Sequence, residues 1–420
     1  MSQPRPSLLF LTQVLPYPLV GGAKIRAYYM LRTLAQQYAV TLVSFVRDDD
    51  RPGDIDHLRQ FCHAVHTVPM PRSRWRDGLA LLHSLASGTP LVVVRDRVPA
   101  MNRLLDQLAQ QTSFAAVHAD QTAMAEYALR VGRGSPRPPR RILDQHNAMH
   151  LLVARQAAYE RGPMRRIWQR EARLLAGYER GLCRQFDHIL TVTEPDRAAH
   201  LALFPPAGAT HLAHKITAVP ICVDPAGTPP IPYQDAGPQI LHLGTMFWPP
   251  NVEGVLWFAT EVLPLVLTQV PDAIFTVAGK QPPPAVQALA EPGSPVHRHV
   301  RITGFVADPT TLLATCRAFV VPVRAGGGMR VKIVDGWQWG VPIVSTRIGA
   351  EGIETRPGEN ILLADEPADF AAAVVSLLTD PGRGAQLRQN GRRWVSDHYN
   401  WHTIYRRVLD IYELASRSAR

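Results

Sequence analysis

The chain has 420 residues, of which 46% are hydrophobic and 19% charged, so it is too long for one typical domain and is not a disordered protein. Its four cysteines are scattered without metal-ligand spacing, and we therefore expect reduced, buried thiols and no zinc. The formal net charge is +10, but no nucleic-acid-binding motif accompanies it, so no nucleic-acid partner is expected.

The first half of the chain alternates short apolar runs with helical patterns, the longest of which runs from about residue 149 to 183. Alternation of this kind favours a parallel sheet covered by helices on both faces. A stretch rich in proline and glycine, residues 225–238, has no periodicity and is interpreted as an interdomain linker. The expected strands are 8–11, 40–46, 64–68, 114–117, 141–143, 188–192 and 216–219.

The second half repeats the pattern, with expected strands at 240–243, 273–277, 300–303, 318–322 and 342–345. We therefore predict an α/β fold with two doubly wound Rossmann-like domains facing across a cleft. Ligands of such sheets bind outside the carboxyl ends of the strands, so the cleft is the expected site. The predicted parts are a first domain, 1–225, a second domain, 226–400, and a C-terminal helix, 401–420, that packs back on the first domain.

A run of three glycines, Gly326 to Gly328, separates the last long apolar strand from a helical pattern. Glycine lets backbone N–H groups approach an anion, and the helix dipole favours negative charge at that end. Arg330 and Lys332 add two cations, and Asp335 is spaced to share a helix face with Lys332. The pattern predicts a diphosphate site, with Asp335 accepting hydrogen bonds from a ribose diol. Solvated charges beside a glycine turn are the competing interpretation.

This stretch, 321–335, is followed by a second apolar strand, 341–346, and by Gly349-Ala-Glu-Gly352. Here the chain resembles the retaining glycosyltransferases of family 4 (glycosyl transferases group 1), which have the GT-B fold. One branch of that family carries Gly-Gly-Gly-x-Arg-x-Lys-x-x-Glu, and Asp335 stands at its last position. The family often has another Glu eight positions earlier, where this chain has Gly327. Further similar segments, in the same order, are 16–22 with Arg26, 189–196, 243–254 and 399–401.

The resemblance implies that a sugar is transferred from a nucleotide-sugar to a glycan, a glycolipid or a small molecule with retained anomeric configuration, as in polysaccharide biosynthesis. It covers nearly the whole chain and implies no metal and no further cofactor. A turn needed only for backbone geometry is the competing interpretation for each glycine. The implied donor-binding residues are Gly22, Gly244, Gly328, Arg330, Lys332, Asp335 and Glu351.

His118 is expected to end a buried strand, and members of the family place a histidine after the corresponding strand, where it faces the donor sugar. The resemblance therefore gives His118 the catalytic role, since an imidazole can hydrogen-bond a sugar or acceptor hydroxyl near neutral pH. His146 ends the next predicted strand and is the alternative to His118. In the first glycine loop, Gly21 is likewise the alternative to Gly22. A strand-end histidine bonded only to backbone is the competing interpretation.

Two other functions stay open: a non-hydrolysing sugar-nucleotide epimerase, and a non-catalytic nucleotide-sugar-binding protein. The charge is uneven, with 28 Lys/Arg against 18 Asp/Glu in residues 1–225 and 17 of each in residues 226–420. Arginines at 72, 74 and 76 surround Trp75 and precede the apolar helical segment 79–85, a pattern typical of an interfacial membrane contact. No apolar run reaches the roughly 18 residues that span a bilayer. A solvated loop before a core helix is the competing interpretation of residues 72–85. We expect a cytoplasmic protein, peripheral at the inner membrane surface, with a glycan or lipid-linked acceptor.

Overall fold

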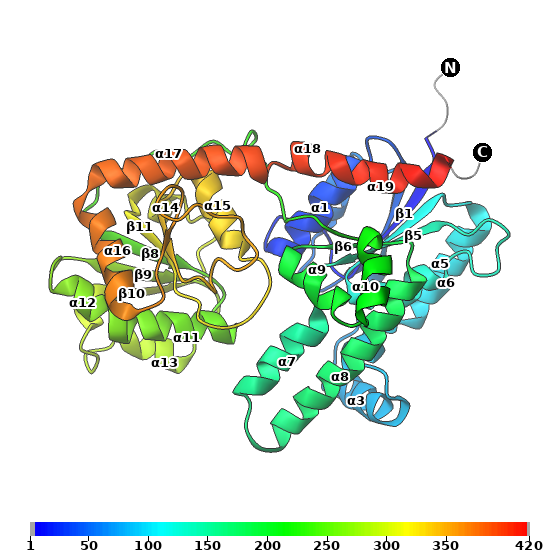
Figure 1. The fold of residues 1–420 in the computed structure, drawn as a ribbon, viewed down its shortest axis with the longest axis horizontal. Helices are drawn as coiled ribbons and strands as arrows, with labels where there is room; N and C mark the ends of the chain where they lie inside the picture. The colour runs from blue at the N-terminus through cyan, green and yellow to red at the C-terminus, as the bar shows by residue number, and fades with distance from the viewer. Residues whose placement is uncertain (1–4, 418–420) are drawn as a thin grey trace. The chain divides into compact units, whose positions relative to one another are not determined.

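The computed structural model describes residues 5–417, and the chain divides into two compact units. The first unit comprises Met1–Cys222 with Trp401–Arg420, and the second comprises Val223–Asn400. Each unit contains one parallel sheet flanked by helices (Figure 1). The α/β architecture with two doubly wound sheets, predicted from the alternation of strands and helices, is confirmed.

The first sheet has seven parallel strands in the order β3-β2-β1-β4-β5-β6-β7. All seven strands expected from the sequence are present. The sequence order reverses between β1 and β4, which makes the carboxyl ends of these two strands the switch point of the sheet. The strands are β1 (Ser7–Thr12), β2 (Ala39–Val46), β3 (Ala64–Pro69), β4 (Ala116–Asp120), β5 (Arg140–Gln145), β6 (His188–Thr191) and β7 (Ile216–Ala218).

The prediction of one long helix over residues 149–183 is wrong, because the structure has two helices there, α7 and α8. Gly162 adopts a φ of 62° and Pro163 follows it, so the helical backbone cannot run through this point. The helices of the first unit are α1 (Gly22–Leu34), α2 (Pro52–Arg59), α3 (Arg74–Ser87), α4 (Leu91–Arg95), α5 (Pro99–Gln111), α6 (Ala125–Arg130), α7 (Met149–Tyr159), α8 (Gly162–Gln185), α9 (Glu194–Leu201), α10 (Pro206–Leu212), α18 (Trp401–Ile404) and α19 (Arg406–Arg417).

The second sheet has six parallel strands in the order β10-β9-β8-β11-β12-β13, and its switch point lies between β8 and β11. The short edge strand β13 was not expected from the sequence. The strands are β8 (Gln239–Leu243), β9 (Ile274–Ala278), β10 (Val300–Gly304), β11 (Ala318–Val321), β12 (Ile343–Ser345) and β13 (Leu362–Leu363). The helices are α11 (Pro249–Trp257), α12 (Leu263–Leu267), α13 (Pro284–Gln287), α14 (Thr310–Thr315), α15 (Val331–Trp339), α16 (Pro367–Thr379) and α17 (Pro381–His398).

The central strands of both sheets contain long apolar runs, as expected where helices cover both faces. Residues 8–11 of β1 and 318–321 of β11 are all completely buried. The last helices belong to the first unit, where the Tyr405 hydroxyl accepts a hydrogen bond from the Cys222 N–H at 3.2 Å. Among the described residues, no helix combines the length and the apolar character needed to cross a membrane.

Candidate functional site

The glycine run connects the carboxyl end of β11 to the start of α15, at the switch point of the second sheet. Gly326 and Gly328 have φ values of 101° and 80°, a region in which a side chain would be strained. The loop therefore needs glycine for its backbone path. It lies where doubly wound sheets bind ligands, as the sequence predicted.

Arg330 immediately precedes α15 and folds back over the glycine run. Its guanidinium donates hydrogen bonds to the carbonyls of Gly327 and Gly328, and to that of Ala325 at 3.3 Å. The residue is only 9% exposed. In this structure Arg330 holds the loop in shape and places a positive charge beneath it, and its direct contact with phosphate stays a prediction.

Lys332 lies in the first turn of α15 and reaches the turn that follows β8. Its Nζ donates to Oδ1 of Asn251 at 3.1 Å, and the Asn251 amide in turn donates to the Thr245 carbonyl at 2.9 Å. A Cβ atom on Gly244 would lie 2.7 Å from the Lys332 Nζ and 2.9 Å from the Asn251 Nδ2. Gly244 therefore leaves room for the ammonium group to sit against the backbone, which ties two of the predicted donor-binding residues together.

His242, on β8, completes this cluster and was not predicted from the sequence. Its Nδ1 lies 2.9 Å from the Val320 carbonyl, which can only accept, so Nδ1 carries the hydrogen and Nε2 is an acceptor. Nε2 would be 3.1 Å from a Cβ on Gly244 and has no hydrogen-bond partner in the described part of the chain. Burial, and secondly the charge of Lys332, lower the pKa of His242 well below its usual value, so the ring is neutral.

Two ionisable side chains of α15 have strongly shifted pKa values. Burial, and secondly the charge of Arg330, lower the pKa of Lys332 to about 7. Burial raises the pKa of Asp335 to about 7. Near neutral pH each group is thus close to its midpoint, and an anionic ligand beside Lys332 would favour the charged ammonium.

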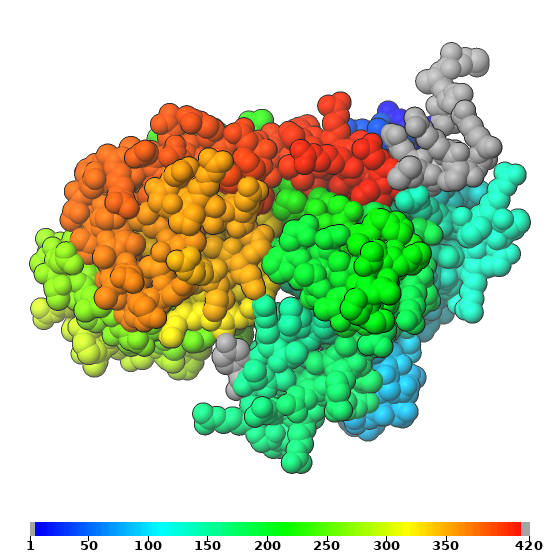
Figure 2. Space-filling model, in the orientation of Figure 1, coloured from blue at the N-terminus to red at the C-terminus, as the bar shows by residue number. Residues whose placement is uncertain are grey.

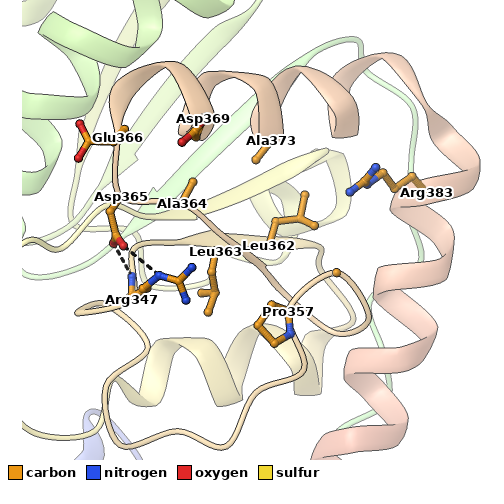
Figure 3. Close-up of a pocket in the computed structure, with 11 residues that line it drawn as sticks. Arg347, Pro357, Leu362, Leu363, Ala364, Asp365, Glu366, Asp369, Ala373 and Arg383 are labelled. Carbon is orange, nitrogen blue, oxygen red and sulfur yellow. Dashed lines mark hydrogen bonds and ion pairs between the residues drawn. The ribbon is translucent and has the colours of Figure 1, made fainter.

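Glu351 lies in the turn after β12, the neighbour of β11, and is partly buried. Arg347, at the start of the same turn, instead pairs with Asp365 at 3.2 Å and lines a pocket of about 480 Å³ beside β13, α16 and α17 (Figure 3). None of the predicted donor-binding residues lines this pocket. The donor contact of Glu351 stays a prediction.

Gly21 and Gly22 lie at the N-terminus of α1, the 13-residue helix that follows β1. Gly21 is the residue before the first helical turn and has a φ of 88°, whereas Gly22 is the first helical residue. The backbone requirement for glycine therefore falls on Gly21. The helix N-terminus near the switch point of the first sheet offers backbone N–H groups to an anion.

The expectation that His118 ends its strand is wrong, because β4 continues to Asp120. The His118 ring is completely buried, stacks on Phe10 at a centroid distance of 4.1 Å, and has its Nδ1 2.6 Å from the Tyr412 hydroxyl. Burial lowers its pKa to about 4. A side chain without exposed surface does not reach a sugar in this structure, and its contacts are those of a residue that packs α19 against the sheet.

His146 directly follows β5, and its Nε2 lies 2.8 Å from Oδ1 of Asp120 at the end of β4. Asp120 pairs in register with Thr12, the last residue of β1. Asp120 Oδ2 and Thr12 Oγ1 are buried and have no hydrogen-bond partner within residues 5–417. These polar atoms lie at the switch point of the first sheet. Sequence reasoning missed Asp120 and Thr12, whose strand-end positions were the available signal.

Arg26 is part of α1 rather than of the glycine loop. It is completely buried, and its Nε lies 2.9 Å from both carboxylate oxygens of Asp144 on β5. Its guanidinium also donates to the Val219 carbonyl beyond β7. Arg26 therefore links α1 to two neighbouring parts of the first sheet and has no surface for a ligand.

Residues 237–380 match the protein family described as "Glycosyl transferases group 1". The matched span runs from β8 through α16 and contains the glycine run, Lys332 and Asp335. This span of the chain, most of the second unit, is therefore similar to glycosyl transferases group 1. This confirms the family predicted from the Gly-Gly-Gly-x-Arg-x-Lys pattern.

Curated relatives match over part of the chain. A protein of the cps region of Klebsiella pneumoniae, described as uncharacterized, is 22% identical over 41% of this chain and 45% of its own length. A GDP-mannose-dependent alpha-(1-6)-phosphatidylinositol monomannoside mannosyltransferase of Mycolicibacterium smegmatis is 27% identical over 36% of this chain and 42% of its own length. The chain thus spans less than half the length of the curated relatives that it matches.

Solved structures match over nearly the whole chain. HepE of Anabaena, in complex with UDP and glucose, has a TM-score of 0.66 at 13% identity and covers 97% of this chain and 99% of its own. A variant of S. aureus TarM, in complex with fondaparinux, alpha-GlcNAc-glycerol and UDP, has a TM-score of 0.67 at 10% identity. The match covers 97% of this chain and 100% of the TarM chain. At these identities the likeness shows the fold, which is GT-B.

Proposed function

We propose that this protein transfers a sugar from a nucleotide-sugar to an acceptor with retention of the anomeric configuration. The observation that carries the proposal is the placement of Lys332 and Gly244 against each other at the switch point of the second sheet, beside the glycine loop. In this assignment the backbone N–H groups of the loop and Lys332 bind the diphosphate. Asp335, one turn further along α15, accepts hydrogen bonds from the ribose.

The chemical role of these groups follows from where charge develops. In the transfer, the bond between the anomeric carbon and the diphosphate oxygen breaks, and the diphosphate leaves with the electron pair. The acceptor oxygen bonds to the same face of the anomeric carbon and loses its proton. Lys332 becomes fully charged as the leaving group becomes more anionic, so its contact strengthens toward the transition state.

Thermal-shift screening with UDP-, GDP-, ADP- and dTDP-sugars tests whether the site binds a nucleotide-sugar and identifies the base. A ligand present at 100 times its Kd stabilises the protein by about 2.7 kcal/mol. We expect one base to raise the melting temperature of the wild type, and Gly244→Ala to abolish the shift, because its Cβ would lie 2.7 Å from the Lys332 Nζ. No shift with any of the four bases would contradict a donor site.

Binding of the matching nucleoside diphosphate should be coupled to proton uptake. Since the pKa of Lys332 is about 7 in the free protein, a bound diphosphate raises it, and the affinity falls as the pH rises above 7, by up to tenfold per unit. Calorimetry at pH 8 in two buffers of different ionisation enthalpy measures the uptake, with Asp335 already ionised there. Lys332→Met should bind more weakly and take up no proton. Equal uptake by both proteins would assign the proton elsewhere.

We propose His146, with Asp120, as the sugar- or acceptor-side pair of the first unit, in place of His118. His146→Ala should reduce transfer about 100-fold, the lower range for loss of an acid–base group, and leave nucleoside diphosphate affinity unchanged. His118→Ala should instead lower stability through a cavity beside Phe10 while turnover per folded molecule stays near wild type. Steady-state kinetics and calorimetry on the two variants decide this, and the reverse pattern would return the role to His118.

We further propose that the first unit docks on an anionic membrane surface and that the acceptor is lipid-linked. Helix α3 exposes Trp75 to 85% and Leu82 to 64%, and the start of α8 exposes Ile167 to 51%. Arg170 of α8 joins the two helices by donating to the Ser84 carbonyl at 2.9 Å, and the two helices lie on one surface in Figure 2. Arginines at 74, 76, 165 and 166 of the same two helices are also exposed. Apolar insertion combined with positive charge is the composition of an interfacial contact.

Co-sedimentation with vesicles tests this surface. We expect binding to vesicles that contain phosphatidylglycerol, weak binding to neutral phosphatidylcholine vesicles, and weaker binding at high salt because the charges are screened. Trp75→Ser with Leu82→Ser should reduce binding at least tenfold. Leu265→Ser, which removes an apolar side chain exposed to 40% on α12 of the other unit, is the matched control and should bind normally. Equal binding by all variants would exclude α3.

A further inference from the structure

Three helices of the first unit each bring one metal-ligating side chain to the same place. His150 lies in the first turn of α7, Glu179 on α8 and His200 on α9. One ligand atom from each lies within 4.8 Å of the others. The His150 Nδ1 is already 2.5 Å from the Glu179 Oε2, with side-chain exposures of 15% and 0%.

His200 is the member of this cluster that the protein alone does not satisfy. It is completely buried, and neither ring nitrogen has a hydrogen-bond partner in the described chain. Leaving such a buried polar group unpaired costs about 1–3 kcal/mol. Burial lowers the pKa of His200, so the ring is neutral and one nitrogen offers a lone pair.

We propose that His150, Glu179 and His200 bind one divalent transition-metal ion, zinc being the best fit to two imidazoles and a carboxylate. Zinc takes such ligands at roughly 2.0–2.2 Å, which places the ligand atoms about 3.3 Å apart in a tetrahedron. Small side-chain movements bring the three atoms to that spacing. A water molecule completes the tetrahedron from the side of His150, the most exposed of the three residues.

The surroundings of Glu179 are those of a metal-ligating carboxylate. It accepts hydrogen bonds from the backbone N–H groups of Met149 at 2.9 Å and His150 at 3.2 Å, which orient its two oxygens. The second cluster of this kind, at Asp144, differs because the guanidinium of Arg26 already occupies it. The ion would have a structural role. It would fix the start of α7, four residues after His146, against α8 and α9.

Sequence reasoning did not find this site because its ligands come from three separate helices rather than from closely spaced cysteines or histidines. The site is independent of the sugar-transfer proposal, since it requires no nucleotide-sugar. Its test therefore needs no activity measurement.

The experiment uses the full chain without a histidine tag, freed of metal by a chelator and titrated with zinc in competition with a chromophoric chelator. We expect one tightly bound equivalent in the wild type and an affinity at least 100-fold lower in His200→Gln and His150→Gln. His188→Gln is the matched control, because His188 is also buried but bonds to the Thr217 hydroxyl at 2.9 Å. Cobalt substitution should give the visible absorption of a tetrahedral site.

If His200→Gln does not fold, His150→Gln decides, because His150 is partly exposed and its loss leaves the core intact. A wild type that binds no stoichiometric zinc would overturn the proposal. So would equal zinc binding by the wild type and both ligand variants, or an equal loss of binding in His188→Gln.

Discussion

Lys332→Ala is expected to lower the turnover number about 100-fold or more at saturating donor, the loss that follows removal of one group that stabilises developing negative charge. The Lys332 ammonium lies in the first turn of α15, against Gly244 and 3.1 Å from the Asn251 Oδ1. Because burial lowers its pKa to about 7, the group is costly to charge in the free protein and becomes charged when the diphosphate arrives. Once charged, the ammonium interacts more strongly as further negative charge develops on the departing diphosphate in the transition state.

The fold should survive this change, since alanine favours a helix and the side chain contributes little to the core. Steady-state kinetics report turnover, and circular dichroism reports folding. Lys215→Ala is the matched control, because Lys215 lies in the other unit next to β7 and should behave as wild type. Turnover within threefold of wild type would remove Lys332 from the reaction.

Arg26→Met is expected to destabilise the first unit by about 3–5 kcal/mol, the usual result of removing one partner of a buried ion pair. Both side chains of the Arg26–Asp144 pair have 0% exposure. Although burial opposes ionisation, the charge of Arg26 keeps the pKa of Asp144 below its usual value. The pair therefore stabilises the fold above the pKa of an unfolded aspartate, about 4, and this contribution is lost as the pH falls.

Lys24→Met, two residues earlier on α1, is the matched control. Lys24 pairs with Asp50 at 3.3 Å, but its side chain is 22% exposed, so its loss should cost under about 1 kcal/mol. Urea denaturation of both variants, followed by fluorescence and circular dichroism, gives the comparison. Equal stability of the two variants would show that Asp144 finds another partner or leaves the core.

The strands and the glycine loop were predictable because each depends on neighbours in sequence. Apolar runs define the strands, and a positive φ defines Gly326 and Gly328 as glycine positions. The family resemblance named Lys332 and Gly244 separately as donor-binding residues, and their approach to each other was found only in the structure. The break between α7 and α8 was missed because a helical periodicity continues on both sides of Gly162 and Pro163, the two residues that interrupt the helix.

The histidines show why the rest was not predictable. His118 and His146 have similar sequence surroundings, but only the structure reveals that β4 continues two residues past His118 and that Tyr412, from the other end of the chain, covers it. His242 and Asn251 are brought to Lys332 by the order of strands in the sheet. Contacts made by residues far apart in sequence carry no local pattern, so sequence reasoning found the segments and missed these side chains.

The central claim is most directly tested by incubating the purified protein with a panel of nucleotide-sugars and a lipid extract as acceptor, with Lys332→Ala in parallel. Release of nucleoside diphosphate and the product are followed by mass spectrometry, and the anomeric configuration of the product is determined by NMR. We predict that one donor releases its nucleoside diphosphate together with formation of a glycoside of retained configuration, at a rate about 100-fold lower in Lys332→Ala. Epimerisation of the donor without release, or binding of the donor without consumption, would contradict sugar transfer.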